Sequence, residues 1–238
     1  MLRLLPVAIL AGGLATRLRP LTERVPKALL EVAGRPFIFH QLELLREQGV
    51  ERVVLCVAHL GEQIRAAVGD GARCGLAVSY SFDGKELQGT GGALRQALPL
   101  LGSEFFVLYG DAYLPCSLPS VQSAFHAARR PALMTVLRND NRWQRSNVLL
   151  RDGELRAYDK RSPQPEMSHI DFGVSVLSRT VFARCAAAGP LDLADVFREL
   201  SLCGQLAALE VSQRFYEIGS PQGLRETEEI LRHRLDGA

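Results

Sequence analysis

The segment Val7-Ala8-Ile9-Leu10-Ala11-Gly12-Gly13 decides how the rest of this 238-residue chain is interpreted. Its four leading apolar residues predict a buried strand, because a short apolar run bounded by a turn signal is typical of a strand in a sheet core. The glycines that follow predict a turn at the carboxyl end of that strand. Ligands of open parallel sheets bind at such ends, so the segment indicates where to look for a site.

The residues after this segment alternate helical patterns with further apolar runs. The predicted strands are Arg52–Val57, Leu76–Phe82 and Phe105–Tyr109, and the predicted helices are Phe37–Gln48, Gly61–Val68 and Thr90–Leu98. Strands that alternate with helices of this length imply right-handed crossovers and a parallel sheet covered on both faces. We therefore expect an α/β fold.

After Asp111 the alternation gives way to a mixture of strands, helices and a hairpin. The hairpin is predicted because Arg151-Asp152-Gly153 separates the short runs Asn147–Leu150 and Glu154–Tyr158. A loop with two prolines is predicted at Arg161–Met167, next to a strand end. The other predicted strands are Ala132–Leu137, Phe172–Leu177, Gln205–Val211 and Arg214–Tyr216, and the predicted helices are Ser120–Ala128, Thr180–Ala187, Asp192–Leu200 and Pro221–Arg234.

Composition restricts the class of protein. The chain has 238 residues, 47% of them hydrophobic, and this length allows one large domain or two small ones. Since there is no repeat or long linker, we expect a single domain over residues 1–238, with 1–115 and 116–238 as its halves. A net charge of +2 provides no general field for nucleic acid or an anionic membrane. Five scattered cysteines, with no signal peptide and no membrane-length apolar run, predict a soluble, cytoplasmic protein.

The strongest functional signal extends the opening segment into a longer loop. Residues 10–22 read Leu-Ala-Gly-Gly-Leu-Ala-Thr-Arg-Leu-Arg-Pro-Leu-Thr, and Pro26-Lys27 follows. Glycines after a strand let backbone N–H groups approach phosphate oxygens, and Arg17 and Lys27 supply positive charge. The spacing matches neither G-x-x-x-x-G-K-[ST] nor G-x-G-x-x-G, which argues against a P-loop ATPase and a standard dinucleotide fold.

This string resembles the family of sugar-1-phosphate nucleotidylyltransferases, whose signature is G-G-x-x-T-R-L-x-P-L-T followed by P-K. The sequence departs from the signature at Ala15, where the family usually has glycine. The resemblance implies a Rossmann-like nucleotide-binding domain with a mixed, mainly parallel sheet flanked by helices. It also implies an enzyme that joins a nucleoside triphosphate to a sugar 1-phosphate, with magnesium, and releases pyrophosphate. It extends from Val7 to about Leu231 with no appended β-helix domain, so we expect the short form of the family.

A second motif, Gln88-Gly89-Thr90-Gly91-Gly92-Ala93, resembles the family's G-T-[AG]-G-A segment. Glycines at a helix N-terminus let a flat base lie against the backbone, whose amides and carbonyls can hydrogen-bond the edge of the base. The alternative is that Thr90 only caps the helix. The resemblance implies a nucleotide site formed by Leu10, Ala11, Gly12, Gly13, Gln88, Gly89 and Thr90.

Two carboxylates match the metal positions of the family. Asp111 follows the predicted strand Phe105–Tyr109, and a carboxylate at such a strand end suits a hard cation that bridges phosphate oxygens. The alternative is an ordinary Gly-Asp turn. Glu217 stands where the family's D-x-G-[ST]-P run has aspartate, so its reach is one methylene longer. The resemblance implies that Asp111 and Glu217 hold Mg²⁺.

A further pair of segments resembles the family's sugar-phosphate site. Asp159-Lys160 is similar to its E-K segment, and Ile170-Asp171-Phe172-Gly173 is similar to its N-x-G segment. The resemblance implies that Lys160 holds the sugar phosphate and that Asp171 and Gly173 lie beside the sugar. Asp171 replaces a common asparagine and, when ionised, offers only hydrogen-bond acceptors, which leaves the identity of the sugar open. A solvated ion pair is the alternative for Asp159-Lys160.

The resemblance also implies roles for the catalytic residues. Arg17 would stabilise the leaving pyrophosphate, Lys27 would lie over the α-phosphate, and Asp111 would bind the metal. No general base is required, because a phosphate monoester is largely ionised at neutral pH. The expected substrates are GTP with heptose 1-phosphate or UTP with an N-acetylated sugar 1-phosphate. The alternatives are a nucleotidyltransferase for a non-sugar phosphate and a regulatory paralogue that binds nucleotide sugar without turnover.

Overall fold

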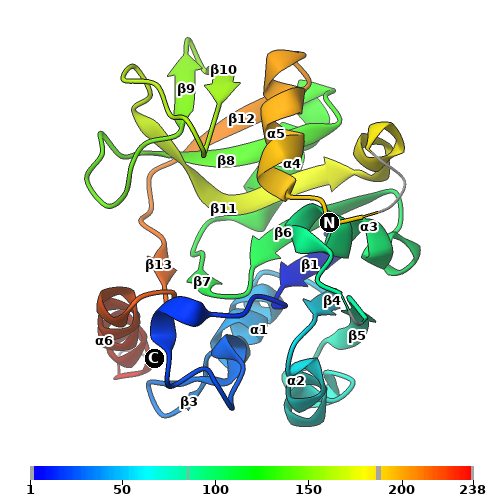
Figure 1. Ribbon diagram of the computed structural model, residues 1–238, viewed down its shortest axis with the longest axis vertical. Coiled ribbons are helices and arrows are strands. Elements are labelled where there is room, and N and C mark those ends of the chain that lie inside the picture. Colours follow the sequence, from blue (N-terminus) through cyan, green and yellow to red (C-terminus); the bar gives the residue numbers. More distant parts are fainter. Residues whose placement is uncertain (1–2, 85, 186–188, 237–238) are drawn as a thin grey trace.

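A mixed sheet crosses the whole molecule (Figure 1). The computed structural model describes residues 3–84, 86–185 and 189–236, and within them this sheet has nine strands. Seven of these strands follow the order β10-β9-β11-β6-β1-β4-β5, while β8 pairs with β11 and β12 pairs with β8. The predicted α/β fold with a mixed sheet flanked by helices is confirmed.

The first half of the chain forms a parallel part of the sheet, as its alternating pattern predicts. Its strands are β1 (Val7–Leu10), β4 (Arg52–Val57), β5 (Ala77–Phe82) and β6 (Glu104–Tyr109), in parallel pairs. The helices between them are α1 (Phe37–Glu47), α2 (Gly61–Val68) and α3 (Gly89–Leu101). Every element predicted up to Tyr109 is present, and α3 continues through Pro99 beyond its predicted end.

The second half extends the sheet around the long strand β11 (His169–Ser178), which pairs antiparallel with β6 and β8. The predicted hairpin is confirmed, because Asp152 and Gly153 both have positive φ, as a two-residue type I′ turn requires. The other elements are β8 (Ala132–Arg138), β9 (Val148–Arg151), β10 (Glu154–Tyr158), β12 (Leu206–Val211), α4 (Leu118–Ala128), α5 (Leu193–Leu202) and α6 (Pro221–Asp236).

Two predicted elements of the second half differ in the structure. Instead of a helix at Thr180–Ala187 the chain forms the 3₁₀ turn Arg179–Arg184, and residues 186 and 187 lie outside the described part of the chain. The β-branched and aromatic residues of this turn lose rotamer freedom in an α-helix, and this loss disfavours the predicted α-helix. The strand predicted at Arg214–Tyr216 lies at Tyr216–Glu217 (β13), because its position is set by antiparallel pairing with β7 (Ala112–Tyr113).

The side chains of β1 divide between two hydrophobic layers. Val7 and Ile9 belong to the layer that contains buried residues of α1, α2 and α4, whereas Ala8 belongs to the layer that contains buried residues of α3 and α5. Alternate residues of a strand face opposite sides of a sheet. Because both sides are covered, every position of the strand must be apolar, which explains the unbroken run in the sequence.

The C-terminal part of the chain crosses back to the first half, as the orange and red segments of Figure 1 show. After β12 the chain passes along the molecule to β13, which pairs with β7, and then enters α6. This return brings Glu217 opposite Ala112, the first residue of β7, which follows β6 in the chain. Within the described residues, no helix has both the length and the apolar character needed to span a membrane.

Candidate active site

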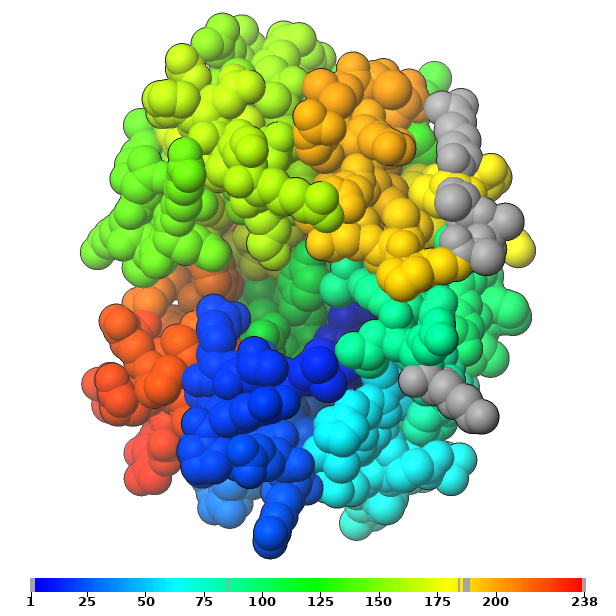
Figure 2. Space-filling model, viewed as in Figure 1, coloured from blue at the N-terminus to red at the C-terminus, as the bar shows by residue number. Residues whose placement is uncertain are grey.

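A cavity of about 270 Å³ lies where β1 and β6 end, and Figure 2 shows it as a hollow at the centre of one face. It is lined by six of the seven residues expected to bind nucleotide, which are Leu10, Ala11, Gly12, Gly13, Gly89 and Thr90. Lys27 and Asp111 line it as well. Gln88 does not line the cavity, and its side-chain amide donates instead to the Glu86 carbonyl at 3.0 Å.

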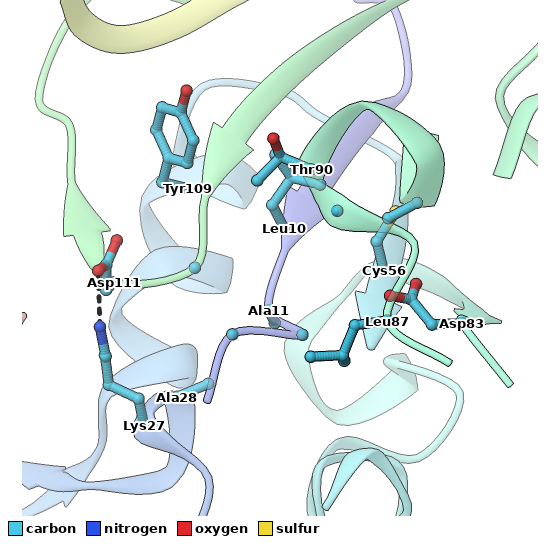
Figure 3. A pocket seen from close by; sticks show the side chains of 15 residues that line it. Leu10, Ala11, Lys27, Ala28, Cys56, Asp83, Leu87, Thr90, Tyr109 and Asp111 are labelled. Atoms are coloured by element: carbon cyan, nitrogen blue, oxygen red, sulfur yellow. Dashed lines mark hydrogen bonds and ion pairs between the residues drawn. The ribbon is translucent and has the colours of Figure 1, made fainter. Parts of the chain in front are cut away.

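An ion pair occupies one side of the cavity (Figure 3). Lys27 Nζ lies 2.8 Å from Asp111 Oδ2, and the two side chains are 17% and 31% exposed. Lys27 begins the 3₁₀ turn Lys27–Leu29 and Asp111 follows β6, so residues 84 positions apart in the chain meet here. The pair places a cation and a carboxylate at the carboxyl end of the sheet, where ligands of open parallel sheets bind.

Gly110 allows the strand ends that carry this pair to approach each other closely. A Cβ at this position would lie 2.8 Å from the Leu10 carbonyl oxygen and 3.0 Å from Ala11 Cα, both of which are backbone atoms. The Gly110 amide donates to that same carbonyl at 2.9 Å. The glycine before Asp111 is therefore required by packing alone, whatever the function of the aspartate.

Arg17 lies in the loop that connects β1 to this pair. The loop contains the 3₁₀ turn Thr16–Leu18, with Leu18 buried, and the Thr22 hydroxyl donates to the Ala15 carbonyl at 2.8 Å. Ala15 has φ +49°, in the left-handed region that favours glycine. The departure from the family signature therefore places Ala15 in a conformation that costs an alanine about 1 kcal/mol more than a glycine.

Three charged side chains converge beside Gly219. A Cβ at Gly219 would lie 3.0 Å from Arg17 Nη2 and 3.3 Å from Asp111 Oδ2, and it would overlap Glu217 Oε2. Glycine is thus needed here to leave room for the charged groups. The two carboxylates that the sequence assigns to a metal, Asp111 and Glu217, are brought together by the pairing of β13 with β7.

The residues at this point fit a hard divalent cation. Carboxylate oxygens from Asp111 and Glu217 are the ligands that Mg²⁺ prefers in proteins. Within the described residues, no group of three or more His, Cys, Asp or Glu side chains is arranged to hold a metal. The other ligands of a Mg²⁺ ion would therefore be phosphate oxygens and waters, as is usual where the ion binds together with a phosphorylated substrate.

The glycines at the start of α3 pack against the segment that precedes α5. The amides of Gly91 and Gly92 donate to the Leu191 carbonyl at 2.8 and 3.1 Å. A Cβ on Gly89, which has φ +71°, would lie 2.6 Å from the same oxygen. These two amides are used inside the protein, so they are not available to the edge of a base.

Thr90 does not cap its own helix. The N-cap position of α3 is Gln88, and no side chain caps that helix. The Thr90 hydroxyl instead accepts a hydrogen bond from the Leu193 amide, in the first turn of α5, at 2.8 Å and donates to Asp192 Oδ1 at 3.0 Å. The threonine of this motif therefore connects α3 to α5.

Asp83, which the sequence motifs do not include, lines the side of the cavity opposite the ion pair, near Leu87 and Cys56 (Figure 3). Its Oδ2 accepts a hydrogen bond from the Gln88 amide at 3.0 Å, which holds the loop before α3. Burial raises the pKa of the Asp83 carboxyl group, although this hydrogen bond opposes the effect. The sequence feature that could have pointed to Asp83 is the Asp83-Gly84 pair directly after β5, at the same sheet edge as Asp111.

The residues expected at the sugar phosphate lie next to the cavity but do not line it. Lys160 Nζ is 5.9 Å from the centre of the Tyr109 ring, and Tyr109 lines the cavity. Burial raises the pKa of Asp171 to about 6, although the Gly173 amide donates to Asp171 Oδ1 at 2.9 Å and Lys160 also favours the ionised form. Gly173 has φ +105°, a conformation that favours glycine, and it lies where the pairing of β11 with β8 shifts register between Asp171 and Ser175.

Asn147 organises this region, and the sequence motifs do not include it. Its side-chain oxygen accepts from the Asp171 amide at 3.1 Å, and its backbone carbonyl accepts from the Asp159 amide at 3.0 Å. A single buried asparagine thus fixes the ends of β10 and β11 relative to each other. Both candidate sugar-phosphate segments, although separate in sequence, depend on it.

Comparison with known proteins agrees with these features. Residues 7–146, more than half of the chain, match the sequence profile of the family described as nucleotidyl transferase. The chain is 45% identical over 104 residues to the N-acetylmuramate alpha-1-phosphate uridylyltransferase of Neisseria meningitidis serogroup B, a match that covers 43% of this chain and 45% of that protein. It is 33% identical over 184 residues to a glucose-1-phosphate thymidylyltransferase of Streptomyces griseus, over 76% of this chain and 52% of that protein. These matches span about half the length of each relative.

The fold also has counterparts among solved structures. HddC from Yersinia pseudotuberculosis, complexed with GMP-PN, aligns with a TM-score of 0.79 at 23% identity, over 95% of this chain and 99% of that chain. At this identity the likeness concerns the fold alone. Because the family profile covers more than half of the sequence and begins at the strand and glycine loop that line the cavity, the chain belongs to the nucleotidyl transferase family.

Proposed function

We propose that this chain is a sugar-1-phosphate nucleotidylyltransferase, which transfers a nucleoside monophosphate from a nucleoside triphosphate to a sugar 1-phosphate. The observation that carries the proposal is the ion pair of Lys27 with Asp111 at one end of the cavity, with Arg17 and Glu217 close to Asp111 beside Gly219. Phosphoryl transfer depends on positioning and charge stabilisation more than on covalent chemistry. Two cations and two carboxylates from four separate segments provide both.

The two ends of the cavity differ in chemistry, and this difference orients a nucleotide in the proposal. Leu87 and Asp83 lie at one end, and the Lys27–Asp111 pair lies at the other (Figure 3). A flat base suits the partly apolar end, where it can contact Leu87, and the phosphates need the cations. The glycine loop after β1 lies along the cavity between these ends, so its backbone would contact the phosphates.

In the proposed reaction, an oxygen of the sugar phosphate forms a bond to the α-phosphorus, and the bond from that phosphorus to the pyrophosphate oxygen breaks. Lys27 neutralises the α-phosphate, Arg17 stabilises charge on the departing pyrophosphate, and Lys160 holds the attacking phosphate. When bound to Asp111 and Glu217, Mg²⁺ would supply further neutralisation of the phosphate charge. No residue needs to remove a proton, because the attacking phosphate is already largely ionised near neutral pH.

Within this class we propose UTP and an N-acetylated sugar 1-phosphate as the substrates. The support is the 45% identity, over 104 residues, to a relative named for uridylyl transfer to N-acetylmuramate 1-phosphate. GTP with heptose 1-phosphate is the competing pair. The two pairs differ in both base and sugar, so one experiment separates them.

The test is a matrix of four nucleoside triphosphates against a set of sugar 1-phosphates, scored by pyrophosphate release at saturating magnesium. We expect release with UTP and an N-acetylated sugar 1-phosphate, and at least a tenfold lower rate with the other triphosphates. Release with GTP and heptose 1-phosphate alone would replace the substrate pair while keeping the reaction. Release only with a non-sugar phosphate would contradict the sugar assignment.

A negative control separates an enzyme from a non-catalytic binding protein. Asp111→Asn removes the negative charge that would bind the metal. Because the side chain is partly exposed, the variant should lose turnover while its circular dichroism spectrum stays unchanged. If the variant keeps more than about a tenth of wild-type activity, equivalent to about 1.4 kcal/mol of barrier, the metal role of Asp111 is wrong. Nucleotide-sugar binding without pyrophosphate release from any pair would identify a regulatory paralogue.

A further inference from the structure

A second cavity, separate from the candidate active site, is lined by three arginines. This cleft, of about 390 Å³, is formed by Arg35, Phe39, Glu43, Arg46, Arg73, Cys74 and Gly75, and it shares no residue with the first cavity. Glu43 is the only carboxylate among these lining residues, so three positive charges face one negative charge. Guanidinium groups offer several N–H donors in a planar fork, which matches the oxygens of a phosphate.

Arg35 is held at this cleft by a buried histidine. Arg35 Nε donates to His40 Nδ1 at 3.2 Å, and its guanidinium also forms an ion pair with Glu43. Since Nδ1 accepts, Nε2 carries the proton and donates to the Val32 carbonyl at 2.7 Å. Burial lowers the pKa of His40, so the ring stays neutral and keeps this acceptor at neutral pH. The position of Arg35 is therefore set before any ligand arrives.

Arg46 and Arg73 have no carboxylate partner within residues 3–84, 86–185 and 189–236. Arg46 lies on the face of α1 that carries Phe39 and Glu43, and its Cδ would be 3.0 Å from a Cβ on Gly75. Gly75, at φ +68°, thus leaves room for the stem of this arginine. Arg73 Nη2 donates to the Ala67 carbonyl at 2.7 Å, which holds its guanidinium while leaving other donors unused.

We propose that this cleft binds a small molecule that carries a phosphate group, with the phosphate on Arg46 and Arg73 and the rest of the molecule against Phe39. The cleft is larger than an inorganic phosphate ion, which favours a phosphorylated organic molecule. Helix α1 connects the cleft to the candidate active site, because Gln41 Nε2 donates to the Tyr109 and Ala112 carbonyls at 3.0 and 2.8 Å. These carbonyls flank Asp111, so a ligand in the cleft contacts the helix that positions the catalytic strand end.

Cys74 lines the cleft and serves as a direct reporter of occupancy. The wild-type protein is treated with iodoacetamide at increasing concentrations of inorganic phosphate, with sodium chloride at equal ionic strength as the reference, and alkylation is measured at each cysteine by mass spectrometry. Cys203 is exposed and lies outside the cleft, so it is the internal control. We expect phosphate to slow alkylation of Cys74 at least threefold and saturably, and to leave Cys203 unchanged.

The double variant Arg46→Gln/Arg73→Gln tests the assignment to these two side chains. Both arginines are exposed, so the variant should retain the wild-type circular dichroism spectrum. Loss of the saturable protection supports the site, whereas equal protection in the variant, or equal slowing by sodium chloride, overturns it. If Cys74 reacts too slowly, a phosphate titration of the arginine Nε–Hε signals by NMR decides. Saturable shifts of signals that the double variant lacks support the site, and their absence overturns it.

Discussion

The Glu217 carboxylate accepts hydrogen bonds from residues of its own segment, and these bonds restrict how it can coordinate a metal. Oε1 accepts from the Ser220 hydroxyl at 2.8 Å, and Oε2 accepts from the Gly219 amide. Both donors belong to the residues that lead into α6, so the carboxylate also stabilises the start of that helix. The backbone places Glu217 opposite Ala112, one residue beyond Asp111. Because the backbone of Glu217 lies opposite Ala112 and not Asp111, the extra methylene of glutamate helps its carboxylate to reach towards Asp111.

Glu217→Asp should weaken magnesium binding and lower activity, although it restores the residue common in the family. The shorter side chain would pull the carboxylate back from Asp111, and Mg²⁺ tolerates little deviation from its octahedral geometry. Glu217→Gln should be worse, because it also removes the charge. The measurement is a magnesium titration of activity at fixed triphosphate for the wild type and both variants. Three superimposable curves would make Glu217 a helix-anchoring residue and leave Asp111 as the sole protein ligand.

Asp171→Asn should stabilise the protein at pH 8 and have little effect at pH 4. The folded pKa of Asp171, about 6, lies above its ordinary value of 3.8. As pH rises from 4 to 6 the unfolded state loses this proton first, so folding becomes less favourable, and the full loss is present above pH 6. Removing the charge should recover on the order of 1–3 kcal/mol at pH 8. Urea denaturation at the two pH values measures the difference.

Asp159→Asn is the control with the opposite sign. The amide of Ser162, followed by the hydrogen bonds from Arg198 and the Arg161 amide, lowers the pKa of Asp159 below its ordinary value. Its ionised form therefore stabilises the fold above that value, and this stabilisation is lost as pH falls. The variant should be less stable than the wild type at pH 8 and still less stable at pH 4, because the stabilisation is lost only below the ordinary value of 3.8. A pH-independent effect of Asp171→Asn would contradict the burial of that charge.

Two glycines near the active site should respond differently to alanine. Gly110→Ala puts a Cβ against backbone atoms and should destabilise the protein by about 2 kcal/mol. Gly13 has no atom within 4 Å of a Cβ position, so Gly13→Ala should change stability by less than about 0.5 kcal/mol. The second variant should nevertheless bind triphosphate at least tenfold more weakly, measured by calorimetry. Unchanged affinity would show that the phosphates do not approach this backbone.

At the scale of elements, the connection between α3 and α5 determines the wall of the cavity. Gly91, Gly92 and Thr90 of α3 all bond to residues 191–193, at the start of α5. Helix α3 follows the predicted base end of the cavity, and α5 belongs to the second half of the chain. The glycine-rich motif therefore has a structural function that its position in the sequence does not reveal.

Thr90→Val should destabilise the protein by about 1–2 kcal/mol, because it removes a hydroxyl that both donates to Asp192 and accepts from the Leu193 amide. Thr90→Ser keeps the hydroxyl and is the matched control, expected within about 0.5 kcal/mol of the wild type. Chemical denaturation of the three proteins gives the comparison. If valine and serine behave alike, the hydroxyl does not connect the two helices.

At the scale of the whole molecule, the two halves share one sheet and both hydrophobic layers. Strands β6 and β11 pair over five residues across the boundary between 1–115 and 116–238. Each layer contains residues of both halves, such as Val7 with Val174 in one and Ala8 with Leu206 in the other. Neither half could bury its apolar face alone, which favours a single cooperative unit.

Unfolding should therefore be one transition, and the only tryptophan allows a direct test. Trp143 belongs to the second half, and its ring contacts the guanidinium of Arg214. Leu42→Ala removes a fully buried side chain of α1 in the first half and should cost about 2–4 kcal/mol. The midpoints from Trp143 fluorescence and from far-UV circular dichroism should coincide and shift together. A Trp143 midpoint that stays at the wild-type value would show that the halves unfold independently.

The sequence alone determined the parallel half of the sheet and the hairpin Val148–Tyr158, because apolar periodicity and turn residues act over a few neighbouring positions. It also indicated that Asp111 would lie near the glycine loop, since residues after parallel strands gather at one sheet edge, and the resemblance of the loop to the family signature implied the same for Lys27. The length of the turn Arg179–Arg184 and the position of β13 were harder to predict, because both depend on what the segment packs against.

Only the tertiary structure decided the contacts between distant segments. The meeting of Glu217 with Asp111 depends on the pairing of β13 with β7, and the bonds of Thr90 depend on where the chain enters α5. Asp83 and the arginine cleft are likewise visible only once separate elements are packed. Such contacts join residues far apart in the chain, and no local pattern encodes them. They form because burying both faces of one sheet leaves few ways to arrange the segments around it.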